Sequence, residues 1–138
     1  MAAACRAAGR SEDSVTLLAV AKGQPLAAVE AATHLGLQDF GENYLQEAIP
    51  KIAALRGREL CWHFIGQLQA NKTRTVAEQF DWVHTVDRER IAQRLSDQRP
   101  FHAPPLQVCL QVRLGAEPGK GGIEPAGVEA LAAFVATL

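Results

Sequence analysis

Five short apolar runs, each followed by a helical pattern, recur at nearly equal intervals along this chain. The runs end at positions 22, 43, 66, 87 and 113, so the successive intervals are 21, 23, 21 and 26 residues. Near-equal spacing, with polar residues or glycine at the end of each run, is typical of parallel α/β layers. No Gly-x-Gly-x-x-Gly turn follows the first run, which favours a (β/α) barrel over a dinucleotide-binding sheet. We therefore expect one domain, residues 1–138, with about five of the eight βα units of a TIM-type barrel.

The apolar periodicity sets the expected elements. Helices are expected over residues 2–10, 25–35, 44–55, 72–80 and 88–98 and from 125 onward, and strands or short extended segments over 15–22, 37–41, 60–66, 82–86 and 106–114. Leu35 belongs to the apolar stripe of the second helix. Pro50 should bend or break the helix that contains it, and Asp87 should cap the helix that follows it. The glycine-rich loop 115–122 is expected to expose Lys120.

Charge and cysteine content limit the classes of function. The chain has 14 basic and 15 acidic residues, and a net charge of −1 gives no electrostatic footprint for nucleic acid or an anionic membrane. No apolar stretch approaches a membrane span and the first residues do not form a signal peptide, so we expect a cytoplasmic protein. The cysteines, Cys5, Cys61 and Cys109, are odd in number and lack Cys-x-x-Cys spacing, which argues against a disulfide framework or a metal site.

The first apolar run ends in a lysine. Residues 15–22 read Val-Thr-Leu-Leu-Ala-Val-Ala-Lys, which predicts a strand buried on both faces. Lys22 would then lie at the carboxyl end of a strand, where α/β folds place their chemistry. Our hypothesis is that Lys22 forms a Schiff base with an aldehyde cofactor; the alternative is a solvated lysine that marks the end of a core strand.

Four ordered motifs give the chain a resemblance to a known family. They are Ala-Val-Ala-Lys at 19–22, Asp-Phe-Gly-Glu-Asn-Tyr at 39–44, Trp-His-Phe-Ile-Gly-Gln-Leu-Gln-Ala-Asn-Lys at 62–72 and Phe-Asp-Trp-Val-His-Thr-Val-Asp at 80–87. In these motifs the chain resembles the pyridoxal phosphate homeostasis protein family. The resemblance implies a barrel of the alanine racemase N-terminal type that holds pyridoxal 5′-phosphate as a Schiff base on Lys22. It also implies a role in intracellular cofactor homeostasis without established catalytic turnover, with pyridoxal phosphate-dependent client enzymes as partners.

The same resemblance suggests cofactor-binding residues beyond Lys22, and no catalytic residue. Asn43 would hydrogen-bond the ring hydroxyl or the pyridine, although it could instead cap the following helix. Tyr44 would form part of the cofactor wall or simply pack, Gly66 would let the backbone approach a ring, and Gln67 would line the mouth. Partial burial of Lys22 should favour loss of its proton. His63 and His84 are expected to be core histidines.

Departures from the family pattern shape further expectations. Gly23 replaces a larger residue and should loosen the turn after Lys22, and Arg113 replaces a common asparagine. The late strand-helix turns that hold the cofactor phosphate in the family would fall after Leu138. We therefore expect this chain to bind the cofactor weakly or not at all, and to self-associate through open sheet edges.

Three other functions remain open at this stage. One is a racemase-like or decarboxylase-like enzyme on the same barrel, which would need a second acid or base across the cofactor. Another is an aldolase that uses the Lys22 amine without any cofactor. The last is a shortened form without a binding function.

Overall fold

The computed structural model describes residues 1–115, 119 and 121–138, so Lys120 and residues 116–118 lie outside the described part of the chain. Five parallel strands form one sheet in the order of the chain: β1 (Ala19–Val20), β2 (Asp39–Glu42), β3 (Cys61–Phe64), β4 (Trp82–Val86) and β5 (Gln107–Leu110). The α-helices are α1 (Ala2–Ala7), α2 (Leu26–His34), α3 (Leu45–Ala54), α4 (Thr73–Gln79), α5 (Glu89–Gln98) and α6 (Val128–Val135). Short 3₁₀ turns are η1 (Glu12–Ser14), η2 (Ala70–Lys72) and η3 (Pro125–Gly127).

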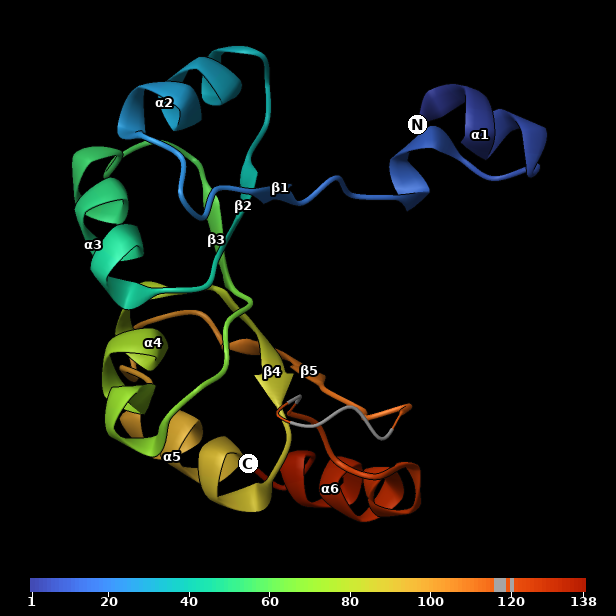
Figure 1. Ribbon diagram of the computed structural model, residues 1–138, viewed down its shortest axis with the longest axis vertical. Helices are drawn as coiled ribbons and strands as arrows, with labels where there is room; N and C mark the ends of the chain where they lie inside the picture. Colours follow the sequence, from blue (N-terminus) through green and yellow to red (C-terminus); the bar gives the residue numbers. More distant parts are fainter. Residues whose placement is uncertain (116–118, 120) are drawn as a thin grey trace.

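The helices α2 to α5 form an arc along the outer side of the sheet, and the strands line the inner side of that arc (Figure 1). Parallel strands joined in chain order by helices on one side are the arrangement of a (β/α) barrel. The expected α/β class and the partial barrel are therefore confirmed. Helix α1 lies away from the sheet, beyond β1.

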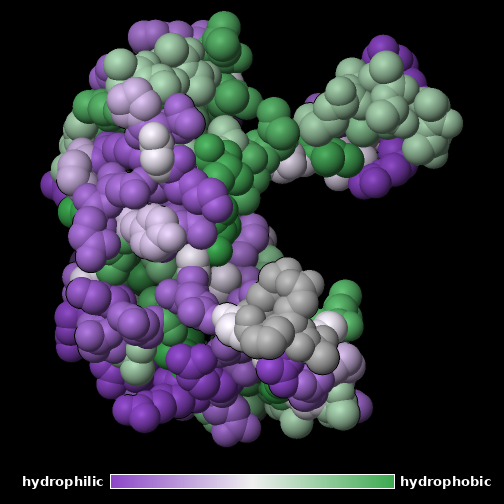
Figure 2. All heavy atoms as spheres, in the orientation of Figure 1, coloured by the Kyte–Doolittle hydropathy of each residue, from purple (hydrophilic) through white to green (hydrophobic). Residues whose placement is uncertain are grey.

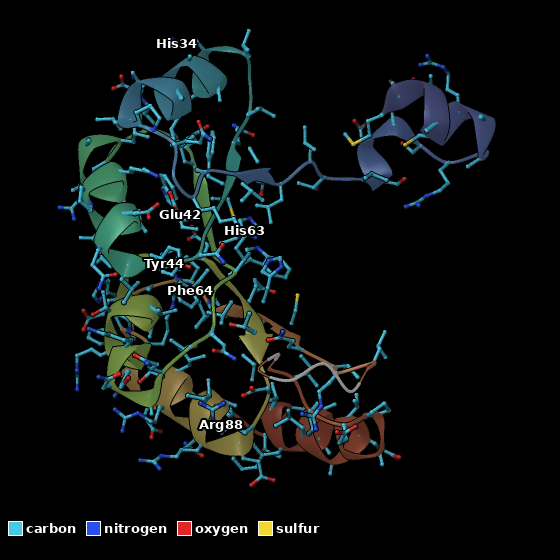
Figure 3. All side chains as sticks on the ribbon, viewed as in Figure 1. His34, Glu42, Tyr44, His63, Phe64 and Arg88 are labelled. Carbon is cyan, nitrogen blue, oxygen red and sulfur yellow. The ribbon has the colours of Figure 1, made fainter. Side chains whose placement is uncertain are left out.

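Alternation along the strands separates two faces of the sheet. Phe40 pairs in register with Trp62, and both are buried in the core between the sheet and the helices. Asp39 pairs with Cys61, and because successive side chains point to opposite faces, these two belong to the other face. Figure 3 shows the same division, with Glu42 on the side of α3 and His63 on the opposite side.

The core between the sheet and the helices includes apolar side chains of α2 and α5. Val29 in α2 and Ile91 and Leu95 in α5 are buried. Leu35 is 85% exposed, so its assignment to the stripe of α2 was wrong: it is the C-cap residue, where the helical period has already ended. Among the residues that the structure describes, no helix has the length and apolarity needed to cross a membrane.

The first strand is much shorter than residues 15–22, and it is not buried on both faces. Ala21 and Ala19 pack against the core, whereas Val20 is 49% and Leu17 55% exposed. Within the described chain β1 pairs only with β2, so the other edge and the inner face are uncovered. The apolar run at residues 15–22 is therefore buried on one face of the sheet only.

Other boundaries also differ from the expectations. Helix α3 continues through Pro50 without a break. Asp87 does not cap α5, because the N-cap residue is Arg88 and no side chain bonds the free N–H groups; the Asp87 carboxylate instead accepts from the Arg88 guanidinium. Strand β5 ends at Leu110, before the glycine-rich loop, and Arg113 forms an ion pair with Glu124.

Candidate functional site

Lys22 lies in a tight turn at the carboxyl end of β1. The Gln24 N–H donates to the Ala21 carbonyl oxygen over 3.1 Å, which closes a β-turn with Lys22 and Gly23 at its centre. Gly23 has a φ of 69°, in the left-handed region that glycine adopts without strain. The Lys22 side chain is exposed, so the expected partial burial is wrong. The reason is the position of β1 at the edge of the sheet, with no described strand on its far side.

Two hydrogen bonds from α3 hold this turn on either side of Lys22. Lys51 Nζ donates to the Ala21 carbonyl oxygen over 2.8 Å, and the Gly23 N–H donates to Glu47 Oε2 over 2.7 Å. The prediction that Gly23 loosens the turn is therefore wrong, because the backbone is fixed immediately before and after the lysine. The Lys22 side chain is therefore exposed, while the backbone that carries it is held in place.

Lys51 is held in place by a buried ion pair. Its Nζ lies 2.6 Å from Glu42 Oε1, and both side chains are buried between β2 and α3. A buried pair is favourable only when further hydrogen bonds satisfy the charges. The Ala21 carbonyl supplies one such bond to the ammonium, whereas Glu42 Oε2 has no partner among the described residues. This pair connects the end of β2 to the Lys22 turn.

A cavity of about 450 Å³ lies at the carboxyl ends of β2 and β3, beside the start of α3. Its wall includes Asn43, Tyr44, Gly66 and Gln67, four of the five residues predicted to bind the cofactor. Lys22 is not part of this wall and follows the neighbouring strand, β1. The sequence did not single out Leu45, Gln46 and Gln69, which complete the cavity together with Phe64 and Lys72. Tyr44 and Phe64 are labelled in Figure 3.

Asn43 does not cap the helix that follows it. The N-cap residue of α3 is Tyr44, and no side chain makes a capping hydrogen bond there. The Asn43 Oδ1 atom is buried and has no hydrogen-bond partner among the described residues. Asn43 lines the cavity, so this unsatisfied acceptor lies in the cavity wall. An acceptor that stays buried without a partner costs about 1–3 kcal/mol.

Gly66 permits a close approach between two strand ends. A Cβ atom at this position would lie 2.1 Å from the Asn43 carbonyl oxygen, far inside a contact distance. The Gly66 carbonyl oxygen also accepts a hydrogen bond of 2.7 Å from Thr85 Oγ1. The glycine is therefore required by the packing of β2 against β3, independently of any bound ring.

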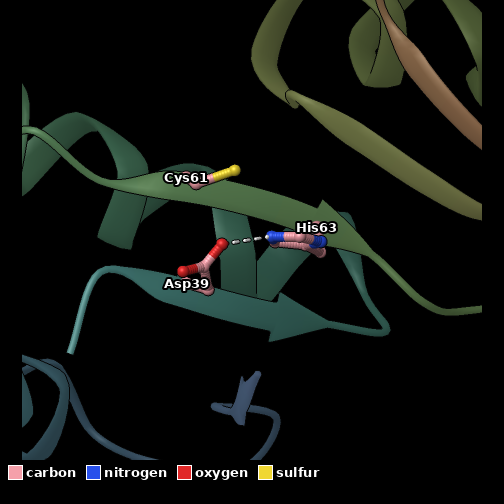
Figure 4. Close-up of side chains that lie close together, drawn as sticks. All are labelled: Asp39, Cys61 and His63. Carbon is pink, nitrogen blue, oxygen red and sulfur yellow. Dashed lines mark hydrogen bonds and ion pairs between the residues drawn. The ribbon is translucent and has the colours of Figure 1, made fainter. Parts of the chain in front are cut away.

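A second polar cluster lies on the inner face of the sheet, away from the helices. His63 is buried; its Nε2 lies 3.0 Å from Asp39 Oδ1 and its Nδ1 lies 2.9 Å from His84 Nε2. Figure 4 shows Asp39, Cys61 and His63 on the facing parts of β2 and β3. Both ring nitrogens of His63 are engaged, as expected of a core histidine.

The surroundings of this cluster shift two pKa values. Burial raises the pKa of the Cys61 thiol to about 12, and the negative charges of Asp81 and Asp39 add to the effect. Burial also lowers the pKa of His84, with a smaller contribution from the charge of His63. Both shifts act in the same sense: they favour the protonated thiol of Cys61 and the neutral imidazole of His84.

The curved parallel sheet, with helices on its outer side and a lysine at the end of its first strand, defines a partial (β/α) barrel with a candidate cofactor site at its carboxyl edge. Residues 3–138 match the family described as alanine racemase, N-terminal domain, and the chain belongs to this family.

Relatives with established names align with nearly the whole chain. The pyridoxal phosphate homeostasis protein of Pseudomonas aeruginosa is 57% identical over 135 residues, which is 98% of this chain and 59% of the relative. The resemblance expected from the four motifs is thereby confirmed. The chain spans about three fifths of the length of that relative.

Two solved structures of PipY from Synechococcus elongatus share the fold. The structure without pyridoxal phosphate superposes with a TM-score of 0.85 at 39% identity, and the structure with pyridoxal phosphate bound superposes with a TM-score of 0.83 at 38% identity. Each alignment covers 98% of this chain and 63% of PipY.

Proposed function

We propose that this chain binds pyridoxal 5′-phosphate, with the weak affinity expected above, and that Lys22 is the amine that condenses with the cofactor aldehyde, releases water and forms a Schiff base. The observation that carries the proposal is the Lys22 turn. Its backbone is fixed by Lys51 and Glu47, and its amine is exposed at the carboxyl edge of the sheet. A nucleophilic amine needs both an accessible nitrogen and a defined position.

The neighbouring cavity fits an aromatic, hydroxyl-bearing cofactor. Asn43 Oδ1 is a buried acceptor without a partner among the described residues, and it would accept a hydrogen bond from the ring hydroxyl or the pyridine N–H. Tyr44 and Phe64 supply aromatic surface, while Gln67 supplies a flexible amide at the mouth. The PipY structure with pyridoxal phosphate bound supports the choice of ligand.

The role that we assign is intracellular pyridoxal phosphate homeostasis in the cytoplasm, with client enzymes that receive the cofactor. The names of the relatives support this role. When bound, the cofactor supplies an electron sink for amino-acid chemistry. We propose that the chain performs no turnover, which the names of the relatives support. The cavity wall contains two groups able to act as a general acid or base, the Tyr44 phenol and the Lys72 amine, so turnover has to be measured directly.

Absorption spectroscopy with pyridoxal phosphate tests the proposal. The wild-type chain should develop the visible band of a lysine Schiff base, and reduction with borohydride followed by peptide mass spectrometry should place the label on Lys22. Lys22→Ala and Lys22→Arg should both lose the band, and the arginine variant keeps the positive charge as a control.

Other outcomes would contradict one part of the proposal each. A label on Lys51, Lys72 or Lys120 instead of Lys22 would contradict the assigned amine. Racemisation or decarboxylation of an amino acid added with the cofactor, followed by chiral analysis, would contradict the absence of turnover while leaving cofactor binding intact.

A further inference from the structure

We propose that Asp39, Cys61 and His63 form a binding site for a zinc ion on the inner face of the sheet. The three residues offer a carboxylate oxygen, a thiolate sulfur and an imidazole nitrogen, and these donor atoms all lie within 4.8 Å of one another. Figure 4 shows that the three side chains come together across β2 and β3. The site is separate from Lys22 and from the cavity beside α3, so it does not depend on the proposed cofactor function.

The register of the sheet brings the donors together. Asp39 is the direct partner of Cys61 across β2 and β3, and His63 lies two residues beyond Cys61 on the same face. The His63 Nε2 atom already lies 3.0 Å from Asp39 Oδ1. Donors around a tetrahedral zinc ion lie about 3 to 4 Å apart, given its bond lengths of roughly 2.0 to 2.3 Å. The donor atoms therefore lie within about 1 Å of the separations that such an ion requires.

A neighbouring residue holds the histidine in the orientation that a metal requires. His84 Nε2 lies 2.9 Å from His63 Nδ1, so with a metal bound the His63 Nδ1–H would donate to His84 and the Nε2 lone pair would face the ion. Histidine ligands in metal sites commonly make such a hydrogen bond through their second ring nitrogen. Trp82 stacks on His63 at 5.7 Å between ring centroids, which further restricts the imidazole.

The local charge favours a cation. Asp39 supplies one carboxylate to the group, and a second carboxylate, Asp81, accepts a hydrogen bond from the N–H of Trp62, the residue that follows Cys61. When zinc binds, the Cys61 thiol loses its proton to solvent and the thiolate donates an electron pair to the ion, so that one proton is released for each ion bound. With three protein donors, water would take the fourth position.

Zinc is the metal that this donor set selects. A set of one sulfur, one nitrogen and one oxygen suits a tetrahedral, borderline-soft ion, whereas magnesium and calcium prefer sets made of oxygen alone. Cobalt(II) occupies the same geometry and reports a bound thiolate through a charge-transfer band.

Cobalt and zinc titrations of the complete chain, purified in the presence of a chelator and then freed of it, test this site. One equivalent of Co²⁺ should give the absorption of a tetrahedral ion with a sulfur charge-transfer band, and Zn²⁺ should displace it. Zn²⁺ should also raise the Tm, because an ion that binds only the folded state stabilises it.

Matched variants make the assignment specific. Cys61→Ser should abolish the charge-transfer band, Cys109→Ser should retain it as a thiol control, and Lys22→Ala should also retain it. His84→Phe, which removes only the partner of the histidine, should weaken Zn²⁺ binding by roughly 10 to 100-fold. Circular dichroism checks that each variant is folded.

Three results would overturn the site. The first is no Co²⁺ binding by the folded wild-type chain at micromolar metal. The second is an octahedral spectrum without sulfur charge transfer, and the third is a charge-transfer band that persists in Cys61→Ser.

Discussion

The Lys51 ammonium group contacts both Glu42, at the end of β2, and the Ala21 carbonyl oxygen, just after β1. Loss of Lys51 should therefore disturb the Lys22 turn more than loss of any other residue. Replacing it with methionine leaves the Glu42 carboxylate buried without its ion-pair partner and removes the bond to the Ala21 carbonyl oxygen. We expect Lys51→Met to lower the free energy of unfolding by about 3–5 kcal/mol. Urea denaturation measures this change.

The double variant Glu42→Gln/Lys51→Met is the control for the ion pair. It removes both charges, so most of the lost stability should return, because the cost of a broken buried pair lies mainly in the charge left behind. Equal losses in the single and double variants would show that Lys51 stabilises the chain through its bond to Ala21 and not through Glu42.

Asn43 gives a prediction that separates a binding role from a packing role. Its Oδ1 atom has no partner among the described residues, so Asn43→Ala removes an acceptor that no described group uses. We expect pyridoxal phosphate binding to weaken by roughly fivefold, the value of one neutral hydrogen bond of about 1 kcal/mol, as measured by spectroscopic titration. Asn71→Ala, an exposed amide outside the cavity wall, should not change the affinity. Equal affinities for wild type and Asn43→Ala would exclude the assigned contact.

At the scale of elements, the contact between the ends of β2 and β3 depends on Gly66. A Cβ there would overlap the Asn43 carbonyl oxygen, a backbone atom that cannot move without shifting β2. We expect Gly66→Ala to destabilise the chain by about 1–3 kcal/mol, as overpacking does. Gly115→Ala is the matched control, because its Cβ would meet nothing within 4 Å, and it should stay within about 0.5 kcal/mol of wild type. Thermal unfolding that is unchanged in Gly66→Ala would contradict the close approach.

Element order and type could be predicted from the sequence because each βα unit repeats its apolar periodicity locally. Strand β4 was predicted at its observed bounds, Trp82–Val86, and it is flanked by strands on both sides. Strand β1 was predicted too long, because an apolar run does not reveal whether a neighbouring strand covers it. Helix capping by Asp87 also failed, since the Arg88 guanidinium competes for that carboxylate.

The candidate site could be predicted only in part, for a related reason. The motifs located Asn43, Tyr44, Gly66 and Gln67, which the fold brings to one cavity wall. The cluster of Asp39, Cys61 and His63 was missed because cysteine spacing was tested within one segment, whereas its donors come from two strands. Asp39 and Cys61 are 22 positions apart, close to the strand repeat, and this was the available signal that they pair.

At the scale of the whole molecule, the uncovered edge of the sheet determines how the chain behaves in solution. Figure 2 shows apolar side chains over the segment that joins α1 to β1 and along the adjacent sheet, in contrast to the mainly polar surface over α3 to α5. Leu17 and Val20 are 55% and 49% exposed there. A strand with an open edge and exposed apolar side chains is a template for pairing with a second chain.

We therefore expect the isolated chain to form dimers or larger species at micromolar concentration, measured by light scattering coupled to size exclusion. Val20→Lys combined with Leu17→Lys should shift the population toward the monomer, because a charge on an edge strand opposes pairing with another edge. Leu35→Lys is the matched control: Leu35 is more exposed, but it lies at the end of α2, and its replacement should leave the mass distribution unchanged. A wild-type chain that stays monomeric would show that the β1 edge does not pair with a second chain. If Leu35→Lys reduced association as much as the β1 variant does, the association would come from exposed apolar side chains in general and not from the β1 edge.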